Sequence, residues 1–147
     1  MVVIDWEHSL GGNFVVSEAA FKSWLDAYGS GWINQEPERT LALFTDDASY
    51  MYTPFHKIMH GKEEIRRYIK KGAVGLQQDI EFSYEILAVT DKFGLCRWKA
   101  ALTWKPTGER LRFDGIYQVF LNDRNLCYRF DEWWHAKPPL PEDNAPE

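Results

Sequence analysis

The segment LALFTDDASYMYTPFHKIMHGKEEIRRYI, residues 41–69, combines a helix end, an aromatic strand and the start of another helix. The first of these helices is expected to end at Leu43–Phe44, because the pair Asp46–Asp47 follows it and favours a turn. Residues 49–54 then alternate in character, which is typical of a strand with one buried face. This order of elements is uncommon in a small domain, and it predicts a pocket beside the strand.

The chain before this segment contains two predicted helices. Ser17 is a suitable N-cap for a helix that starts at Glu18. Four residues recur at the helical period and predict its buried face: Phe21, Trp24, Leu25 and Tyr28. Gly29 and Gly31 are expected to end this helix. Pro37 suits the first turn of a second, shorter helix that ends at Phe44.

A third helix follows Gly61, because Ile65, Tyr68 and Ile69 share one apolar face. The rest of the chain then alternates between β-forming segments and turns. Four strands are predicted, at residues 80–90, 95–104, 111–121 and 126–135. Helices that precede a meander of strands indicate an α+β domain. We expect three helices to cover one face of a curved, mainly antiparallel sheet, giving a cone that is open between the helices and the sheet.

The composition fits one globular domain. The chain has 147 residues, of which 45% are hydrophobic and 16% aromatic. So many aromatic side chains are expected either to line a cavity or to form a bulky core and a dimer surface, and both remain open. The expected organisation is an N-terminal arm at 1–16, a domain at 17–136 and a disordered acidic, proline-rich tail at 137–147.

Charge and cysteine content restrict the partners and the compartment. The net charge of −5 argues against binding to nucleic acid or to acidic membranes, which requires a basic face. The segment at 1–15 does not resemble a signal peptide, and no apolar run is long enough to span a membrane. We therefore expect a cytoplasmic protein in which Cys96 and Cys127 are free, buried thiols.

The sequence resembles the SnoaL-like branch of the nuclear transport factor 2-like (NTF2-like) superfamily, which includes small polyketide cyclases. The matching segments are residues 21–32, LFTDDASY at 43–50, HGKEEIRRYI at 60–69, GIYQVF at 115–120 and RFDEWW at 129–134. The resemblance implies the cone-shaped, cystatin-like α+β fold with a mixed sheet, a central cavity and a homodimer formed through the exposed sheet face. The superfamily includes isomerases, dehydratases, cyclases, epoxide hydrolases and binding proteins, so the resemblance does not define the reaction.

Glu132 is the main candidate for an acid or base. It shares one predicted strand face with Leu126, Tyr128, Phe130 and Trp134, and an apolar setting raises the pKa of a carboxyl group. In relatives a carboxylate at this place often faces the cavity. The alternative is a structural carboxylate that pairs with an arginine or accepts a hydrogen bond from a tryptophan.

Tyrosines are the candidate hydrogen-bond donors to a substrate oxygen. The resemblance places Tyr28 where the ketosteroid isomerase branch has its oxyanion-binding tyrosine, and Tyr117 near that branch's acidic donor. Tyr50 and Tyr52 share one face of the first strand. The isomerase branch has its proton-abstracting Asp just before a proline on this strand, where this chain has Thr53, so the steroid isomerase mechanism is not expected.

Other candidates concern the wall of the cavity. Trp24, Phe130 and Trp134 are expected to contact an apolar substrate, and His56 to lie at the cavity mouth. No metal site is expected, because His56 and His60 are separated by a strand end and a turn. Arg97 is expected on the sheet face opposite the cavity, which argues against the carboxylate–arginine–carboxylate group of the epoxide hydrolases.

Two hypotheses follow. The first is a cofactor-free enzyme that carries out acid–base chemistry on a small apolar carbonyl or aromatic compound by cyclisation, isomerisation or elimination. Glu132 would transfer the proton, and four tyrosines would orient the substrate oxygen: Tyr28, Tyr50, Tyr52 and Tyr117. The second is a non-catalytic small-molecule-binding or dimeric interaction module, in which Glu132 has a structural partner.

Overall fold

The computed structural model describes residues 15–140, so most of the predicted arm and the tail beyond 140 lie outside the described residues. The helical elements are α2 (Glu18–Ile33), α3 (Pro37–Leu41), α4 (Lys62–Ile69) and a π-helical turn, η1 (Lys70–Val74). The strands are β1 (Phe44–Met51), β2 (Met59–His60), β3 (Gln77–Val89), β4 (Phe93–Trp104), β5 (Glu109–Leu121) and β6 (Cys127–Lys137).

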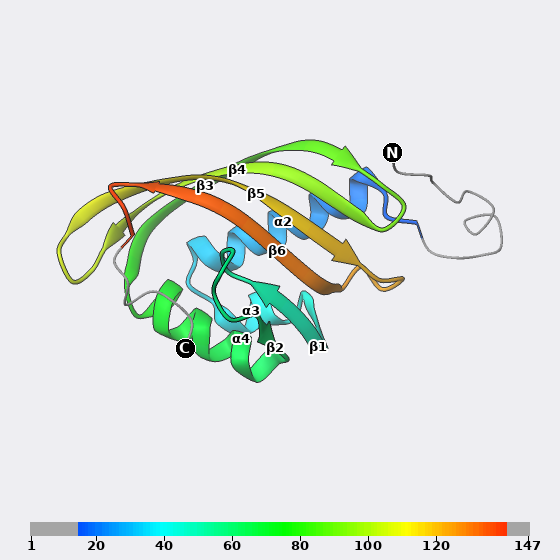
Figure 1. Ribbon diagram of the computed structural model, residues 1–147, viewed down its shortest axis with the longest axis horizontal. Helices are drawn as coiled ribbons and strands as arrows, with labels where there is room; N and C mark the ends of the chain where they lie inside the picture. Colours follow the sequence, from blue (N-terminus) through cyan, green and yellow to red (C-terminus); the bar gives the residue numbers. More distant parts are fainter. Residues whose placement is uncertain (1–14, 141–147) are drawn as a thin grey trace.

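The six strands form one curved sheet in the order β2-β1-β6-β5-β4-β3. The long strands arch over α2, and α3 and α4 lie below the arch next to β1 and β2, the last two strands at one side of the sheet (Figure 1). The predicted α+β architecture, with helices on one face of a mixed sheet, is confirmed. No helix within residues 15–140 is both long and apolar enough to cross a membrane.

Strand β6 holds the two parts of the sheet together. It pairs antiparallel with β5, with Tyr117 opposite Glu132, and parallel with β1, with Tyr50 opposite Phe130. A parallel pair requires a long crossover between its strands. Here the whole chain from β1 to β6 supplies that crossover, so the first and last strands of the chain meet in one wall.

Several local predictions agree with the structure. The Ser17 side chain accepts a hydrogen bond from the Ala20 amide at 3.0 Å and caps α2. Pro37 begins α3, and α4 follows Gly61. The four long strands match the expected segments to within a few residues. The two cysteines are free and buried, and burial raises the pKa of the Cys96 thiol to about 12.

The prediction that Gly29 and Gly31 end the first helix is wrong, because α2 continues to Ile33. Both glycines are sites of close approach to neighbouring elements. A Cβ atom at Gly29 would lie 2.6 Å from the Phe82 ring, and one at Gly31 would lie 2.3 Å from Thr40 Oγ1. The glycines therefore permit tight packing within the helix.

The prediction of a helix up to Phe44, ended by Asp46–Asp47, is also wrong. Helix α3 stops at Leu41, and the acidic pair lies within β1 with both side chains exposed. The pairing of β1 with β6 is regular at Phe44 and again from Ser49, with an irregularity between them. Backbone pairing with the last strand therefore overrides the local turn preference of the aspartates.

Replacement of Gly31 by alanine tests whether close packing requires the glycine. Alanine is the better helix former by about 1 kcal/mol, but its Cβ would overlap Thr40. We expect Gly31→Ala to lower the free energy of unfolding by about 1–3 kcal/mol, measured by urea denaturation. The control is Ser23→Ala on the exposed face of the same helix. A Gly31→Ala protein as stable as the wild type would contradict the close contact.

Candidate active site

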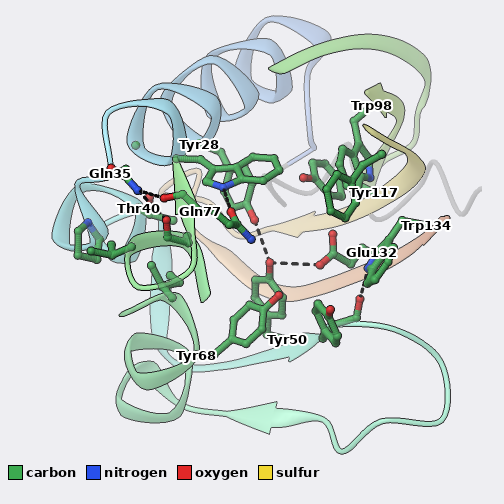
Figure 2. A pocket seen from close by; sticks show the side chains of 18 of the residues that line it. Tyr28, Gln35, Thr40, Tyr50, Tyr68, Gln77, Trp98, Tyr117, Glu132 and Trp134 are labelled. Carbon is green, nitrogen blue, oxygen red and sulfur yellow. Dashed lines mark hydrogen bonds between the residues drawn. The ribbon is translucent and has the colours of Figure 1, made fainter. Parts of the chain in front are cut away.

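A cavity lies between the concave face of the sheet and the helices, and tyrosine hydroxyls and indole rings dominate its wall (Figure 2). Five tyrosines line it: Tyr28, Tyr50, Tyr52, Tyr68 and Tyr117. It offers about 70 Å³ to the centres of water molecules, whereas one water needs roughly 10–15 Å³. The cavity therefore has room for several waters or for a small ring.

Glu132 places one carboxyl group in this wall. Its side chain is buried, with a relative exposure of 5%. Its one hydrogen bond to the described residues is a long contact, 3.5 Å from Tyr50 Oη to Oε1, and it has no ion pair with any of them. Burial raises the pKa of Glu132 well above 4.5, and the Tyr50 hydrogen bond opposes this only in part.

Tyr50 and Tyr28 extend this contact into a chain of hydroxyl groups. Their Oη atoms lie 2.9 Å apart, and the dashed lines in Figure 2 run from Tyr28 through Tyr50 to Glu132. The Tyr28 ring also meets the Tyr117 ring edge-on, with centroids 5.6 Å apart. Burial, followed by the nearby Glu132 carboxyl, raises the pKa of both Tyr28 and Tyr50. These phenols are therefore neutral hydrogen-bond donors at physiological pH.

A layer of aromatic rings behind the wall supports these hydroxyls. The Phe130 ring stacks on Tyr50 with centroids 4.5 Å apart and on Tyr28 at 5.4 Å. Trp24 stacks on Tyr28 at 5.1 Å and also contacts Phe130 at 5.9 Å, so the three rings form one cluster. Because each phenol is packed against such rings, its hydroxyl has little freedom to leave the cavity.

The cavity wall contains most of the residues that the sequence suggested. Six of them line it: Tyr28, Tyr50, Tyr52, Tyr117, Glu132 and Trp134. Trp134 donates a hydrogen bond from Nε1 to the Tyr52 carbonyl oxygen at 3.0 Å, which joins β6 to the end of β1. These contacts come from four different elements, so only the folded chain brings the residues together.

Three suggested residues do not line the cavity. Trp24 is in the core behind Tyr28, and its Nε1 donates to the Leu43 carbonyl oxygen at 3.1 Å. Phe130 is fully buried beneath the tyrosines. His56 is exposed in the loop after β1 and stacks on the outer side of Tyr52, with ring centroids 5.6 Å apart.

The expectation that Tyr128 shares the face of Glu132 is wrong. Tyr128 is 41% exposed and packs against Phe120. The pairing of β5 with β6 is irregular between Phe120 and Leu121, which shifts the alternation of side chains at the start of β6. Arg97, as expected, lies away from the cavity, where it forms a two-pronged pair with Asp114 at 3.0 and 2.6 Å.

The structure also adds lining residues that sequence reasoning missed, among them Tyr68, Gln77 and Trp98. The helical pattern alone places Tyr68 on a packing face of α4. Trp98 Nε1 is buried and has no acceptor among residues 15–140. No group of three or more His, Cys, Asp or Glu side chains in the described part of the chain is arranged to hold a metal ion.

The raised pKa of Glu132 predicts a specific pH dependence of stability. Between pH 4.5 and the folded pKa, the native state retains a proton that the unfolded chain loses, so stability falls as pH rises. Each pH unit in that interval lowers the free energy of unfolding of the wild type by about 1.4 kcal/mol, whereas Glu132→Gln has no carboxyl at this position and no such loss. We expect the variant to gain stability relative to the wild type from pH 4 to pH 8 in urea titrations. A constant difference across this range would contradict a raised pKa.

Comparison with known proteins identifies the family. The family model for the SnoaL-like domain matches residues 6–125, which is most of the chain. Comparison with curated proteins gives no match. Glu132 lies beyond the segment that the family model matches.

Solved structures show the same fold at low identity. SalBIII, an epoxide hydrolase/cyclase-like enzyme with a role in pyran ring formation in the polyether salinomycin, superposes with a TM-score of 0.71 and 16% identity over 80% of this chain and 92% of its own. A protein from Xanthomonas campestris pv. campestris that is classed as a polyketide cyclase gives 0.69 and 10%, over 78% and 90%.

A ketosteroid isomerase-like protein from Erwinia carotovora atroseptica gives a TM-score of 0.63 and 16% identity, over 79% of this chain and 94% of its own. At these identities the superpositions establish the fold, and the family match rests on the sequence. The chain belongs to the SnoaL-like domain family, within the NTF2-like superfamily.

Proposed function

We propose that the protein is a cofactor-free enzyme that transfers protons on a small, largely apolar carbonyl or aromatic compound bound in the cavity. The observation that carries the proposal is the Glu132 carboxyl, which is buried in an aromatic cavity without a cationic partner among the described residues. A buried carboxyl with a raised pKa exchanges protons near neutral pH more readily than an exposed one.

The position of Glu132 suits proton abstraction next to a carbonyl group. In the ionised form of Glu132 the carboxylate accepts the proton as the carbon–hydrogen bond breaks, and the electron pair moves onto the carbonyl oxygen. The resulting enolate is stabilised by hydrogen bonds from neutral phenols, for which Tyr28 and Tyr117 are the proposed donors. Return of the proton to another carbon gives isomerisation, attack by the enolate carbon gives cyclisation, and loss of a leaving group gives elimination.

Tyr50 has a different proposed role from the other phenols. Because it contacts both Glu132 and Tyr28, it connects the acid to the donor through one hydroxyl group. Tyr52 and Trp134 form the apolar and aromatic wall next to Glu132. Such a wall excludes water from the enolate and strengthens each hydrogen bond to it.

A non-catalytic binding module is the alternative, and the aromatic lining of the cavity is compatible with it. That alternative predicts a structural partner for Glu132. The hydrogen bond to Glu132 is long, and no cationic side chain within residues 15–140 pairs with the carboxyl, which supports the enzyme instead. Structural neighbours with cyclase-like and isomerase-like names, which share the fold, support the same choice.

Hydrogen exchange tests the proposed chemistry without knowledge of the natural substrate. 1-Indanone in D₂O, followed by NMR, reports the exchange of the hydrogens next to its carbonyl group. We expect the wild type to accelerate this exchange and Glu132→Gln to reduce the acceleration by about 100-fold or more. The matched control is Glu85→Gln, an exposed glutamate on β3, which should exchange at the wild-type rate.

Two outcomes would contradict the proposal. Equal exchange rates for wild type and Glu132→Gln would exclude Glu132 as the proton-transfer group. Binding of 1-indanone by the wild type with no acceleration of exchange would favour the binding module.

A further inference from the structure

Gln77, the first residue of β3, places an amide group in the cavity wall at the helix end. Its side chain is buried, with a relative exposure of 7%. The proposed proton transfer does not use it, and a buried amide is costly unless its hydrogen bonds are satisfied. Its presence in an aromatic wall therefore requires an explanation.

Trp32 fixes the direction of this amide. The Trp32 Nε1 group donates to Gln77 Oε1 at 2.8 Å. An indole nitrogen is a donor only, so the oxygen end of the amide must face Trp32 and the NH₂ end must face the other way. In Figure 2 the Gln77 nitrogen points into the cavity, toward the hydroxyls of Tyr28 and Tyr50.

Gln35 fixes the backbone of the same residue. Its side-chain Nε2 donates to the Gln77 carbonyl oxygen at 2.5 Å and to the Ala73 carbonyl oxygen at 2.9 Å. Gln77 is thus held at its backbone by one neighbour and at its side chain by another. The one side-chain hydrogen bond of Gln77 to residues within 15–140 is at Oε1, so its Nε2 group is a preorganised donor that faces the cavity.

We propose that Gln77 is a specificity-determining residue that binds an acceptor oxygen of the ligand, and that Trp32 is its positioning residue. The preferred ligand is then an apolar ring with a carbonyl oxygen, since a hydrocarbon would leave the amide donor unpaired. The buried Trp98 Nε1 group, which also lacks a described acceptor, favours an acceptor-bearing ligand as well. This inference rests on the proposed function in that it takes the same cavity as the ligand site.

Two probes of nearly equal shape distinguish the contribution of the carbonyl oxygen to binding from that of the ring. 1-Indanone and indane differ by one carbonyl oxygen, and their affinities can be measured by the quenching of tryptophan fluorescence. We expect the wild type to bind 1-indanone about three- to tenfold more tightly than indane, as one neutral hydrogen bond allows. Gln77→Met should bind both equally, because it keeps the length of the side chain and loses the donor.

Two further variants complete the design. Gln78→Met makes the same change at the next residue, whose side chain is exposed, and should keep the wild-type ratio. Trp32→Phe keeps an aromatic ring but releases the amide, so the ratio should fall part of the way toward one. A loss of packing alone would weaken both probes together and leave their ratio unchanged.

NMR of the wild type provides a readout that does not depend on the folding of any variant. The Gln77 side-chain NH₂ resonances should shift with 1-indanone and remain in place with indane. An unchanged affinity ratio in Gln77→Met, equal binding of the two probes by the wild type, or NH₂ resonances unmoved by 1-indanone would each overturn the proposal. The binding measurements require no turnover. If hydrogen exchange is not accelerated but the affinity ratio and the NH₂ shifts are as expected, the proposed function fails and the proposed role of Gln77 stands.

Discussion

The removal of the Glu132 carboxyl from water is the constraint on which the arrangement of the cavity depends. A carboxylate in an apolar surrounding is costly unless it is paired, and this group responds by binding its proton more tightly. The next residue along the strand shows the contrast. Asp131 faces the other side of the sheet, where the Arg129 guanidinium donates to it at 2.8 Å. Strand β6 therefore carries an ion-paired acid on one face and, on the cavity face, an acid without a cationic partner among residues 15–140.

The topology of the sheet creates the surroundings of that acid. Strand β6 is paired on one side with β5 and on the other with β1, so Tyr117 and Tyr50 approach Glu132 from both neighbours. Helix α2, which packs beneath the arch of the sheet, adds Tyr28 (Figure 1). Tyr28 and Tyr50 share a hydrogen bond, Tyr50 contacts the acid, and a second layer of rings holds these phenols in position. The acid and the phenols are thus brought together inside a largely apolar core.

Much of the fold could be predicted from local patterns, because helix periodicity, strand alternation and capping depend on residues that are close in sequence. The face that contains Tyr28 and the alternation around Tyr117 are examples. The predictions of secondary structure are wrong where a contact with a residue distant in sequence determines the local conformation. The helix continues through Gly31, which packs closely against Thr40, and Asp46 lies in a strand whose flanking residues Phe44 and Ser49 pair with the last strand.

The candidate site was predictable in part for the same reason. Glu132 is conspicuous as a carboxyl group on an apolar strand face. Trp24 and Tyr28 share one helix face, but only Tyr28 reaches the cavity, because Trp24 packs behind it. Gln77 carries no local signal at all. Its role depends on a hydrogen bond from Trp32, and the residues that hold it in place become neighbours only after folding.

A ¹³C NMR titration of the Glu132 side-chain carboxyl carbon, assigned by its absence from Glu132→Gln, tests the state of this acid most directly. We predict that this carbon titrates well above pH 4.5, because the carboxyl is buried without a cationic partner among residues 15–140. Titration at or below pH 4.5 would mean that the carboxyl is ionised and stabilised in the fold, and would rule out Glu132 as a buried acid with a raised pKa.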